Sequence, residues 1–141
     1  MIKNHKPITP VRFYFVISSL LIIFCNGIDG EGQSYVLQGR TLVLAHRGIA
    51  RKAPENTFAA IKMAYREGYD GVEIDVRMAK SGELIVFHDS TLERTSNGKG
   101  LVEEKTWDEL KQLDVGSYFN PRFQGEKIPL LRDVIDAMQK K

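Results

Sequence analysis

Two histidines lie at the ends of apolar segments, at comparable positions. His46 follows residues 41–45 and precedes Arg47, whereas His88 follows residues 84–87. A pair of imidazoles can take up one proton and deliver another near neutral pH, which is what general acid/base catalysis requires. A lone histidine is more often an ordinary core or surface residue, but two at equivalent positions favour catalysis. We therefore predict that His46 and His88 form an acid/base pair.

Two carboxylates, Glu73 and Asp75, are two residues apart in the apolar segment 71–76. Side chains with this spacing point to the same face of a strand, while Ile74 points to the other face. Two acids on one buried face repel each other unless a cation lies between them, and Ca²⁺ or Mg²⁺ prefers such oxygen ligands. We predict a divalent metal site at Glu73 and Asp75. The alternative is a half-exposed strand with two solvated acids.

Three further charged residues could assist this chemistry. Arg47 carries a planar guanidinium that suits two oxygens of a phosphate group. Glu55 either supports the metal or favours the start of the following helix through the helix dipole. Asp89 either orients His88 or caps the next turn. We predict phosphate binding for Arg47 and leave both alternatives open for each acid.

A strand, a helix and a second strand are expected to position these groups. Residues 41–45 form a continuous apolar run, which is typical of a parallel strand buried on both faces. Asn56 or Thr57 caps a helix that reaches Glu67, and residues 71–76 form the second strand. This order is a βαβ unit. The apolar face of the helix is expected to consist of Phe58, Ile61 and Tyr65.

The segment 84–87 follows the second strand too closely for a parallel crossover, which needs roughly a dozen residues. Ser81 and Gly82 therefore predict a turn, and the two segments an antiparallel hairpin. In the expected register Glu73 lies opposite His88, which would bring a carboxylate and an imidazole together.

Two more helices are expected after the hairpin. Residues 106–109 form a capping box that opens a short helix. Pro129 begins a last helix. The glycine-rich residues 96–100 lack the spacing of a P-loop and predict a turn. The apolar face of the last helix is expected to consist of Leu131, Val134, Ile135 and Met138.

Residues 1–33 have the pattern of an export segment and linker. Basic residues precede an apolar run, residues 13–25, that is short for a membrane span of about 20 residues. We predict a cleaved signal peptide and an exported protein, either periplasmic or extracellular. An uncleaved anchor or lipidation at Cys25 are the alternatives, and membrane contact is expected only through this segment. Residues 34–141 are the predicted domain.

Composition excludes little but is informative about partners. The chain has 141 residues and a formal net charge of +2. A near-neutral balance of this kind gives no argument for a nucleic-acid partner. Cys25 is the only cysteine, so an intramolecular disulfide is impossible.

The segment from Leu42 to about Leu131 resembles the glycerophosphodiester phosphodiesterase family. Each matching motif is weak alone, but all occur in order and at the family's spacing. The motifs are His46-Arg47-Gly48, Pro54-Glu55-Asn56-Thr57, Glu73-Ile74-Asp75-Val76, Ser81-Gly82, Val86-Phe87-His88-Asp89, Thr91 to Thr95, Gly98 and Ile128-Pro129-Leu130.

This resemblance implies an α/β fold, the N-terminal portion of a TIM-type (β/α)₈ barrel of the phospholipase-C-like phosphodiesterase kind. It implies hydrolysis of a small-molecule glycerophosphodiester to sn-glycerol 3-phosphate and an alcohol, with a divalent cation. The implied roles are acid/base catalysis for His46 and His88, phosphate binding for Arg47 and metal binding for Glu73 and Asp75.

A complete barrel of this kind needs about 250 residues. We therefore expect the domain at 34–141 to be an incomplete barrel, truncated before a further metal-binding glutamate that the family pattern places beyond Lys141. Two parallel strands cannot close a barrel and would leave unpaired edges. We expect such a fragment to be inactive alone. Two other functions remain open, namely a phospholipase-D-like phosphodiesterase acting on sphingomyelin or lysophospholipid, and a non-catalytic, membrane-tethered binding fragment.

Overall fold

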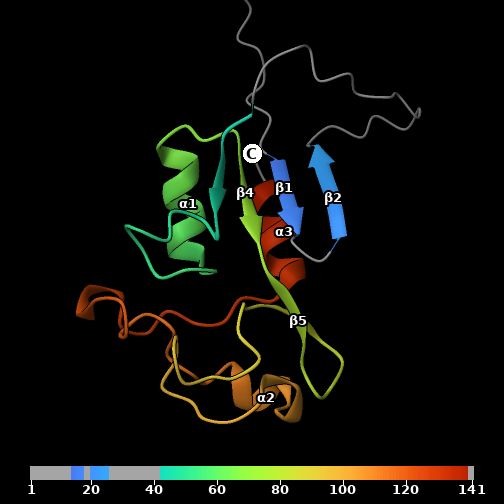
Figure 1. Cartoon of the computed structure of the whole chain (residues 1–141), viewed down its shortest axis with the longest axis vertical. Helices are drawn as coiled ribbons and strands as arrows, with labels where there is room; N and C mark the ends of the chain where they lie inside the picture. The colour runs from blue at the N-terminus through green and yellow to red at the C-terminus, as the bar shows by residue number, and fades with distance from the viewer. Residues whose placement is uncertain (1–13, 18–19, 26–41, 140–141) are drawn as a thin grey trace, which may run out of the picture.

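The computed structural model describes residues 14–17, 20–25 and 42–139 (Figure 1). Residues 1–13, 18–19 and 26–41, which belong to the predicted export segment, linker and start of the domain, lie outside the described residues. In chain order the elements are β1 (Tyr14–Ile17), β2 (Leu20–Cys25), β3 (Leu44–His46), α1 (Phe58–Arg66), β4 (Gly71–Ile74), β5 (Val76–Met78), β6 (Leu84–Val86), the 3₁₀ turn η1 (Val102–Glu104), α2 (Trp107–Leu110), the 3₁₀ turn η2 (Pro121–Phe123) and α3 (Leu131–Gln139).

The main sheet has the strand order β2-β1-β4-β3, with β1 and β3 both parallel to β4. The edge of β4 that was expected to be unpaired is therefore covered by β1, which itself forms an antiparallel pair with β2 (Figure 1). Covering an open edge satisfies backbone groups that would otherwise lack partners. The apolar run 13–25 thus contributes two strands that the sequence analysis did not predict. No helix among the described residues is long and apolar enough to span a membrane.

The first predicted strand is shifted and less buried than expected. The strand begins at Leu44 rather than at residue 41 and includes His46. Ala45 is buried, but Val43 is 57% exposed. The prediction of a strand buried on both faces was therefore wrong for this stretch, because Ala45 is the one residue of 42–46 that is buried in a core.

Helix α1 begins and ends as its sequence predicts. Thr57 is the N-cap, and its hydroxyl accepts a hydrogen bond from the N–H of Ala60. Gly68 follows the last turn with a φ of +77°, a left-handed conformation that glycine adopts without strain. The buried face differs from the prediction, because Tyr65 is 42% exposed. Small side chains let the helix approach the sheet closely, and the buried residues are Ala60, Ile61 and Ala64.

The predicted second strand is divided at Asp75 into β4 and β5, which belong to different sheets. The predicted hairpin is present, because β5 pairs antiparallel with β6 and Val76 lies opposite Val86. The predicted pairing of Glu73 with His88 is wrong. Glu73 lies in the parallel pair of β3 and β4, where its partner is His46.

Two hydrophobic cores hold the described chain together. The strand core lies between the main sheet, α1 and α3, and the loop core lies around β6, η1 and α2 (Figure 1). The N–H of Val86 donates to the carbonyl of Pro129, which ties β6 to the segment before α3. The strand core consists of Ala45, Ile49, Ile61, Ala64, Val72, Ile74, Val86 and Val134. The loop core consists of Ala79, Ile85, Phe87, Leu92, Val102, Leu110, Val115, Ile128 and Leu130.

The two later helices are present with small shifts. α2 carries the predicted capping box, in which Thr106 and Glu109 bond reciprocally. α3 begins at Leu131 rather than at Pro129. Val134 is its fully buried residue, and Leu131 and Met138 pack against the strand core as predicted.

Candidate active site

His46 is the last residue of β3, and Glu73 lies beside it on the neighbouring strand β4. Because the two strands are parallel and in register, His46 Nε2 lies 3.7 Å from Glu73 Oε2. This is an ion-pair distance when the imidazole is protonated. The His46 side chain is 70% exposed, so a ligand can reach it, whereas Glu73 is 16% exposed. The carboxyl end of parallel strands is where α/β barrels place reactive groups.

A tight turn after β3 fixes Arg47. Its φ is +54°, which is unusual for a residue other than glycine, and its N–H donates to Glu73 Oε2 at 3.2 Å. Gly48 has a φ of +75°, and a Cβ at this position would lie 2.6 Å from the Cβ of Ala60. The turn therefore requires glycine next to Arg47. Such strained conformations are typical of functional sites.

The amide of Asn56 holds Asp75 in place. Asn56 also has a positive φ, +58°, and its Nδ2 donates to Asp75 Oδ2 at 2.9 Å. The N–H of Asp75 donates back to Asn56 Oδ1 at 3.2 Å. The sequence analysis left Asn56 and Thr57 as alternative caps of α1. The structure assigns that role to Thr57 and makes Asn56 the clamp of Asp75.

The guanidinium of Arg47 lies between two acids. Arg47 Nη1 donates to Glu55 Oε1 at 2.9 Å, and Nε lies 3.1 Å from Asp75 Oδ2. Nε is nevertheless the one buried side-chain nitrogen or oxygen of the described residues that lacks a hydrogen bond. Buried donors are normally satisfied, so the 3.1 Å contact with Asp75 leaves this N–H able to donate to an acceptor of a ligand. A phosphate oxygen would be a suitable one.

Asp89 contacts the ring of His88. Nδ1 of His88 lies 2.5 Å from Asp89 Oδ1. The guanidinium of Arg94, together with the bond from His88, holds the pKa of Asp89 well below its usual range. An ionised carboxylate only accepts hydrogen bonds, so Nδ1 carries the proton and Nε2 is left as the acceptor in neutral His88. Of the two predicted roles for Asp89, the contact favours orientation of His88.

Arg94 is a site residue that the sequence analysis did not identify as functional. Its guanidinium bonds both oxygens of Asp89, at 2.5 and 2.9 Å, and both oxygens of Glu55, at 2.9 and 2.7 Å. It thereby lowers the pKa of Glu55. Glu55 itself precedes the first turn of α1, so the alternative of a helix-dipole role is not supported. Its carboxylate links Arg94 to Arg47.

Tyr118 is the second such residue, and it comes from the irregular segment after α2. Its hydroxyl accepts a hydrogen bond from the N–H of Glu55 at 3.2 Å, across 63 positions of the chain. Burial raises the pKa of the Tyr118 hydroxyl. No periodic pattern surrounds Tyr118 or Arg94. The sequence signals for Arg94 are its place in the motif Thr91 to Thr95 and its position five residues after Asp89.

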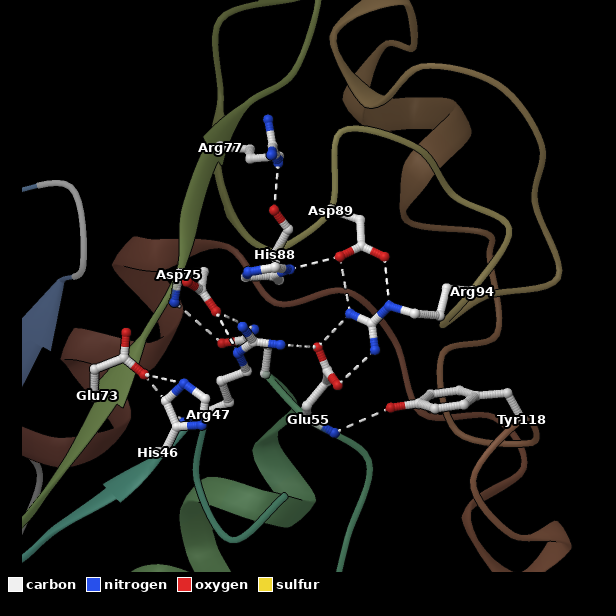
Figure 2. A network of polar contacts seen from close by, with 11 residues as sticks. His46, Arg47, Glu55, Glu73, Asp75, Arg77, His88, Asp89, Arg94 and Tyr118 are labelled. Carbon is white, nitrogen blue, oxygen red and sulfur yellow. Dashed lines mark hydrogen bonds and ion pairs between the residues drawn. The ribbon is translucent and has the colours of Figure 1, made fainter. Parts of the chain in front are cut away.

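The predicted residues therefore converge, although not in the predicted pairing. Figure 2 shows them gathered between β3, β4 and the loop after β6. Contacts run without interruption from one histidine to the other. The order of contacts is His46, Glu73, Arg47, Glu55, Arg94, Asp89 and His88.

The donor atoms near β4 suit a hard cation in kind but not in number. Glu73 and Asp75 offer partly buried carboxylate oxygens, which Ca²⁺ and Mg²⁺ prefer. Within residues 14–17, 20–25 and 42–139, however, no group of three or more His, Cys, Asp or Glu could hold a metal ion. These two acids can supply only part of a ligand set.

Relatives of the chain share the segment that carries this site. Residues 46–141 match the model of the glycerophosphoryl diester phosphodiesterase family. A glycerophosphodiester phosphodiesterase of Caldanaerobacter subterraneus is 48% identical over 99 residues, which are 70% of this chain and 41% of the relative. A Bacillus subtilis enzyme of the same name is 40% identical over 136 residues, covering 89% of this chain and 46% of the relative. The chain thus spans less than half the length of these relatives.

Solved structures agree with this relationship. A glycerophosphodiester phosphodiesterase from Agrobacterium tumefaciens has a TM-score of 0.69 at 43% identity, covering 70% of this chain and 43% of the other. A phosphodiesterase from Oleispira antarctica, solved with its product sn-glycerol 3-phosphate, has a TM-score of 0.68 at 43% identity, covering 70% and 40%. The predicted fold class, α/β and part of a (β/α)₈ barrel, is confirmed. The chain belongs to the glycerophosphoryl diester phosphodiesterase family.

Proposed function

We propose that residues 42–139 form the acid/base and phosphate-binding part of an active site that hydrolyses glycerophosphodiesters to sn-glycerol 3-phosphate and an alcohol. The observation that carries this proposal is the uninterrupted series of contacts that joins His46 to His88 through Arg47 (Figure 2). Family membership supports the reaction class. The product bound to the Oleispira antarctica relative supports the glycerol 3-phosphate product.

The two histidines are suited to opposite halves of a proton transfer. His88 keeps its proton on Nδ1 through Asp89, so Nε2 can accept a proton from an attacking hydroxyl or water. His46 lies 3.7 Å from the carboxylate of Glu73, where its protonated form makes an ion pair, so it can deliver a proton to the leaving oxygen. Both rings are accessible, at 70% and 41% exposure.

Arg47 is proposed to bind the phosphate. Its buried Nε lies 3.1 Å from Asp75 without a hydrogen bond, and its Nη1 shares Glu55 with Arg94. Glu73 and Asp75 would hold Ca²⁺ or Mg²⁺ together with further ligands. The cation would polarise a phosphoryl oxygen and stabilise negative charge there. Arg47, held in its strained turn, would orient the same group relative to His46.

Export of the protein is a separate proposal that rests on residues 1–33. Basic residues before the apolar run 13–25 support a leader, whereas the pairing of β1 with β4 would keep this run in the folded chain. The mass of the protein recovered from a cell envelope or culture medium shows whether the N-terminal segment is cleaved off or retained. A product that lacks the apolar run 13–25 supports cleavage, and an intact N-terminus contradicts it.

The reaction is tested with a chimera in which residues 42–139 replace the matching segment of the Oleispira antarctica enzyme. We expect release of sn-glycerol 3-phosphate from glycerophosphocholine with Ca²⁺ or Mg²⁺, and its loss with EDTA. His46→Ala or His88→Ala should lower the rate by about 10²-fold or more, because each removes one proton transfer. The 141-residue chain is assayed in parallel, and turnover by it would refute the expectation that it is inactive alone.

Arg132→Ala is the matched control, because this side chain on α3 is 77% exposed and forms its ion pair with Asp133, which is not a site residue. It should leave the rate of the chimera unchanged. Full activity after substitution of both histidines would reject the acid/base assignment. Release of choline from sphingomyelin or lysophospholipid in place of glycerol 3-phosphate would favour the phospholipase-D-like alternative.

A further inference from the structure

Arg94 bonds two acids at once, and each acid belongs to a different part of the site. One edge of its guanidinium faces Asp89, the partner of His88, and the other faces Glu55, the partner of Arg47 (Figure 2). The Arg94 side chain is 48% exposed, whereas Glu55 is 15% and Asp89 is 21% exposed. Exposed ion pairs stabilise folded proteins little, so stability alone is a weak reason for this arrangement.

We propose that Arg94 is a positioning residue, which fixes the proton of His88 on Nδ1 by holding Asp89 in its hydrogen-bonding orientation. The inference rests on the proposed function, because His88 is a catalytic residue only if the site hydrolyses phosphodiesters. It concerns a proton position in the resting protein, however, and can be tested without turnover.

The geometry gives Asp89 a reason to need support. Its short side chain follows His88 directly in an exposed loop, and the bond to the ring uses Oδ1. Arg94 Nη2 contacts the same oxygen, while Nε contacts Oδ2. A bidentate contact fixes the plane of a carboxylate as well as its position. Without it the carboxylate of Asp89 is free to rotate away from the ring.

The second carboxylate anchors Arg94 itself. Both oxygens of Glu55 accept from Arg94, and the N–H of Glu55 is fixed by the hydroxyl of Tyr118. Glu55 thus holds the guanidinium at the distance where it can reach Asp89. The same sharing reduces the negative charge that Glu55 presents to Arg47, so Arg47 keeps positive charge for an anion.

The test reads the position of the proton on His88 by nitrogen-15 NMR of the 141-residue chain, labelled uniformly. The chain has three histidines, so His88→Ala and His46→Ala spectra assign the rings. The spectra are recorded at about pH 8, where ordinary imidazoles with a pKa of about 6.5 are neutral. The variants are Arg94→Ala, Arg94→Lys and Arg132→Ala.

We expect the Nδ1–H form at His88 in the wild type and in Arg132→Ala. In Arg94→Ala the Nε2–H form should become the major one. Arg94→Lys should give an intermediate mixture, because an ammonium can attract Asp89 but cannot bond both acids as a fork. A change confined to His88, with the His46 signals unmoved, is the signature that a merely structural role would not produce.

Two results would overturn the inference. One is a wild-type spectrum in which His88 is mainly the Nε2–H form. The other is an Arg94 variant whose His88 signals match those of the wild type; if Arg94→Ala unfolds, the same criterion is applied to Arg94→Lys. Failure of the proposed function would appear separately, as an inactive chimera whose His88 signals still depend on Arg94.

Discussion

The strand core and the loop core contribute different kinds of residue to the same site. The paired strands β3 and β4, which line the strand core, supply His46 and Glu73. The positions of these two side chains therefore follow from the register of the strands. The loops around the loop core supply His88, Asp89 and Arg94, which are held by charged side chains rather than by a sheet. One half of the site is therefore fixed by the backbone. The other half depends on its own ion pairs.

Close backbone packing is the property that the two regions share, and substitution of a glycine in each should have the largest effects. Gly48→Ala combines a φ of +75° with a clash against Ala60, and Gly116→Ala would bring a Cβ to 1.9 Å from the carbonyl oxygen of Phe123. We expect losses in unfolding free energy of about 4 and about 3 kcal/mol, from strain and overpacking. Gly125→Ala, with φ +91° and open space, should cost only about 1 kcal/mol.

Urea denaturation followed by circular dichroism measures the unfolding free energy of these three variants. Equal effects for Gly48→Ala and Gly125→Ala would mean that only the positive φ matters at Gly48 and that close packing against Ala60 adds nothing. A large effect confined to the first glycine would show that the segment around Gly116 is not required by the folded state. That result would contradict the premise that both regions depend on close backbone packing.

Truncation of one buried side chain in each core tests whether the two cores unfold together. Ile61 in the strand core and Leu110 in the loop core are both fully buried. Truncation of either to alanine should cost about 3 kcal/mol, from lost burial and the cavity left behind. Trp107 is the only tryptophan and packs against the loop core, so its fluorescence reports that region. Arg66→Ala, at an exposed position of α1, is the control.

We expect Ile61→Ala to move the fluorescence transition and the circular dichroism transition by the same amount. The reason is that β6 contributes to both cores, through Val86 and Ile85, and is bonded to Pro129. Separate transitions would mean that the two regions are independent units. The site would then lie across a weak boundary.

Helix caps give a smaller contrast. Thr57 is fully buried, donates to the carbonyl of Pro54 and accepts from Ala60, so Thr57→Ala should cost about 1–2 kcal/mol. Thr106 caps a helix of only four residues at a half-buried position, so Thr106→Ala should cost about 0.5 kcal/mol. Replacement by serine, which keeps the hydroxyl, controls for each. If Thr106→Ala costs more than Thr57→Ala, the loop core depends on α2 more than its length indicates.

The same contrast explains what could be predicted from the sequence. The order β3, α1, β4 and the ends of α1 followed from local signals, because buried strands, an N-cap and a terminal glycine act over a few residues. Glu73 was placed correctly on the second strand, whereas His46 ends β3 instead of following it, and Asp75 lies between β4 and β5. The pairing of Glu73 with His88 failed because the hairpin places Val76 opposite Val86, one residue away from the expected register. In addition, the strand is interrupted at Asp75, whose N–H donates to Asn56.

Long-range contacts of irregular segments escaped the sequence analysis. Arg94 reaches Glu55 across 39 positions, and Tyr118 reaches it across 63. No periodicity marks either residue, because neither lies in a helix or strand. The pairing of β1 with β4 was missed for a related reason, since an apolar run indicates burial but does not indicate in what it is buried.

Asp89 and Asp114 allow the last and smallest test, because both acids have a lowered pKa for different reasons. Arg94 is the main cause at Asp89, whereas the backbone N–H groups of Ser117 and Gly125 are the main cause at Asp114. A lowered folded-state pKa stabilises the protein above the ordinary value near 4, and this stability is lost as the pH falls below it. Melting temperatures of the wild type should therefore drop below about pH 4.

Salt separates the two causes. Ion pairs at the surface contribute less than about 1 kcal/mol and are screened, whereas short hydrogen bonds to amides are much less so. The destabilisation by Asp89→Asn should therefore shrink between low salt and about 1 M NaCl, while that by Asp114→Asn persists. Glu103→Gln, at an exposed acid, controls for general charge effects. If the destabilisation by Asp89→Asn is independent of salt, packing rather than charge holds His88. The proposed contrast, in which the backbone fixes one half of the site and ion pairs fix the other, is then wrong.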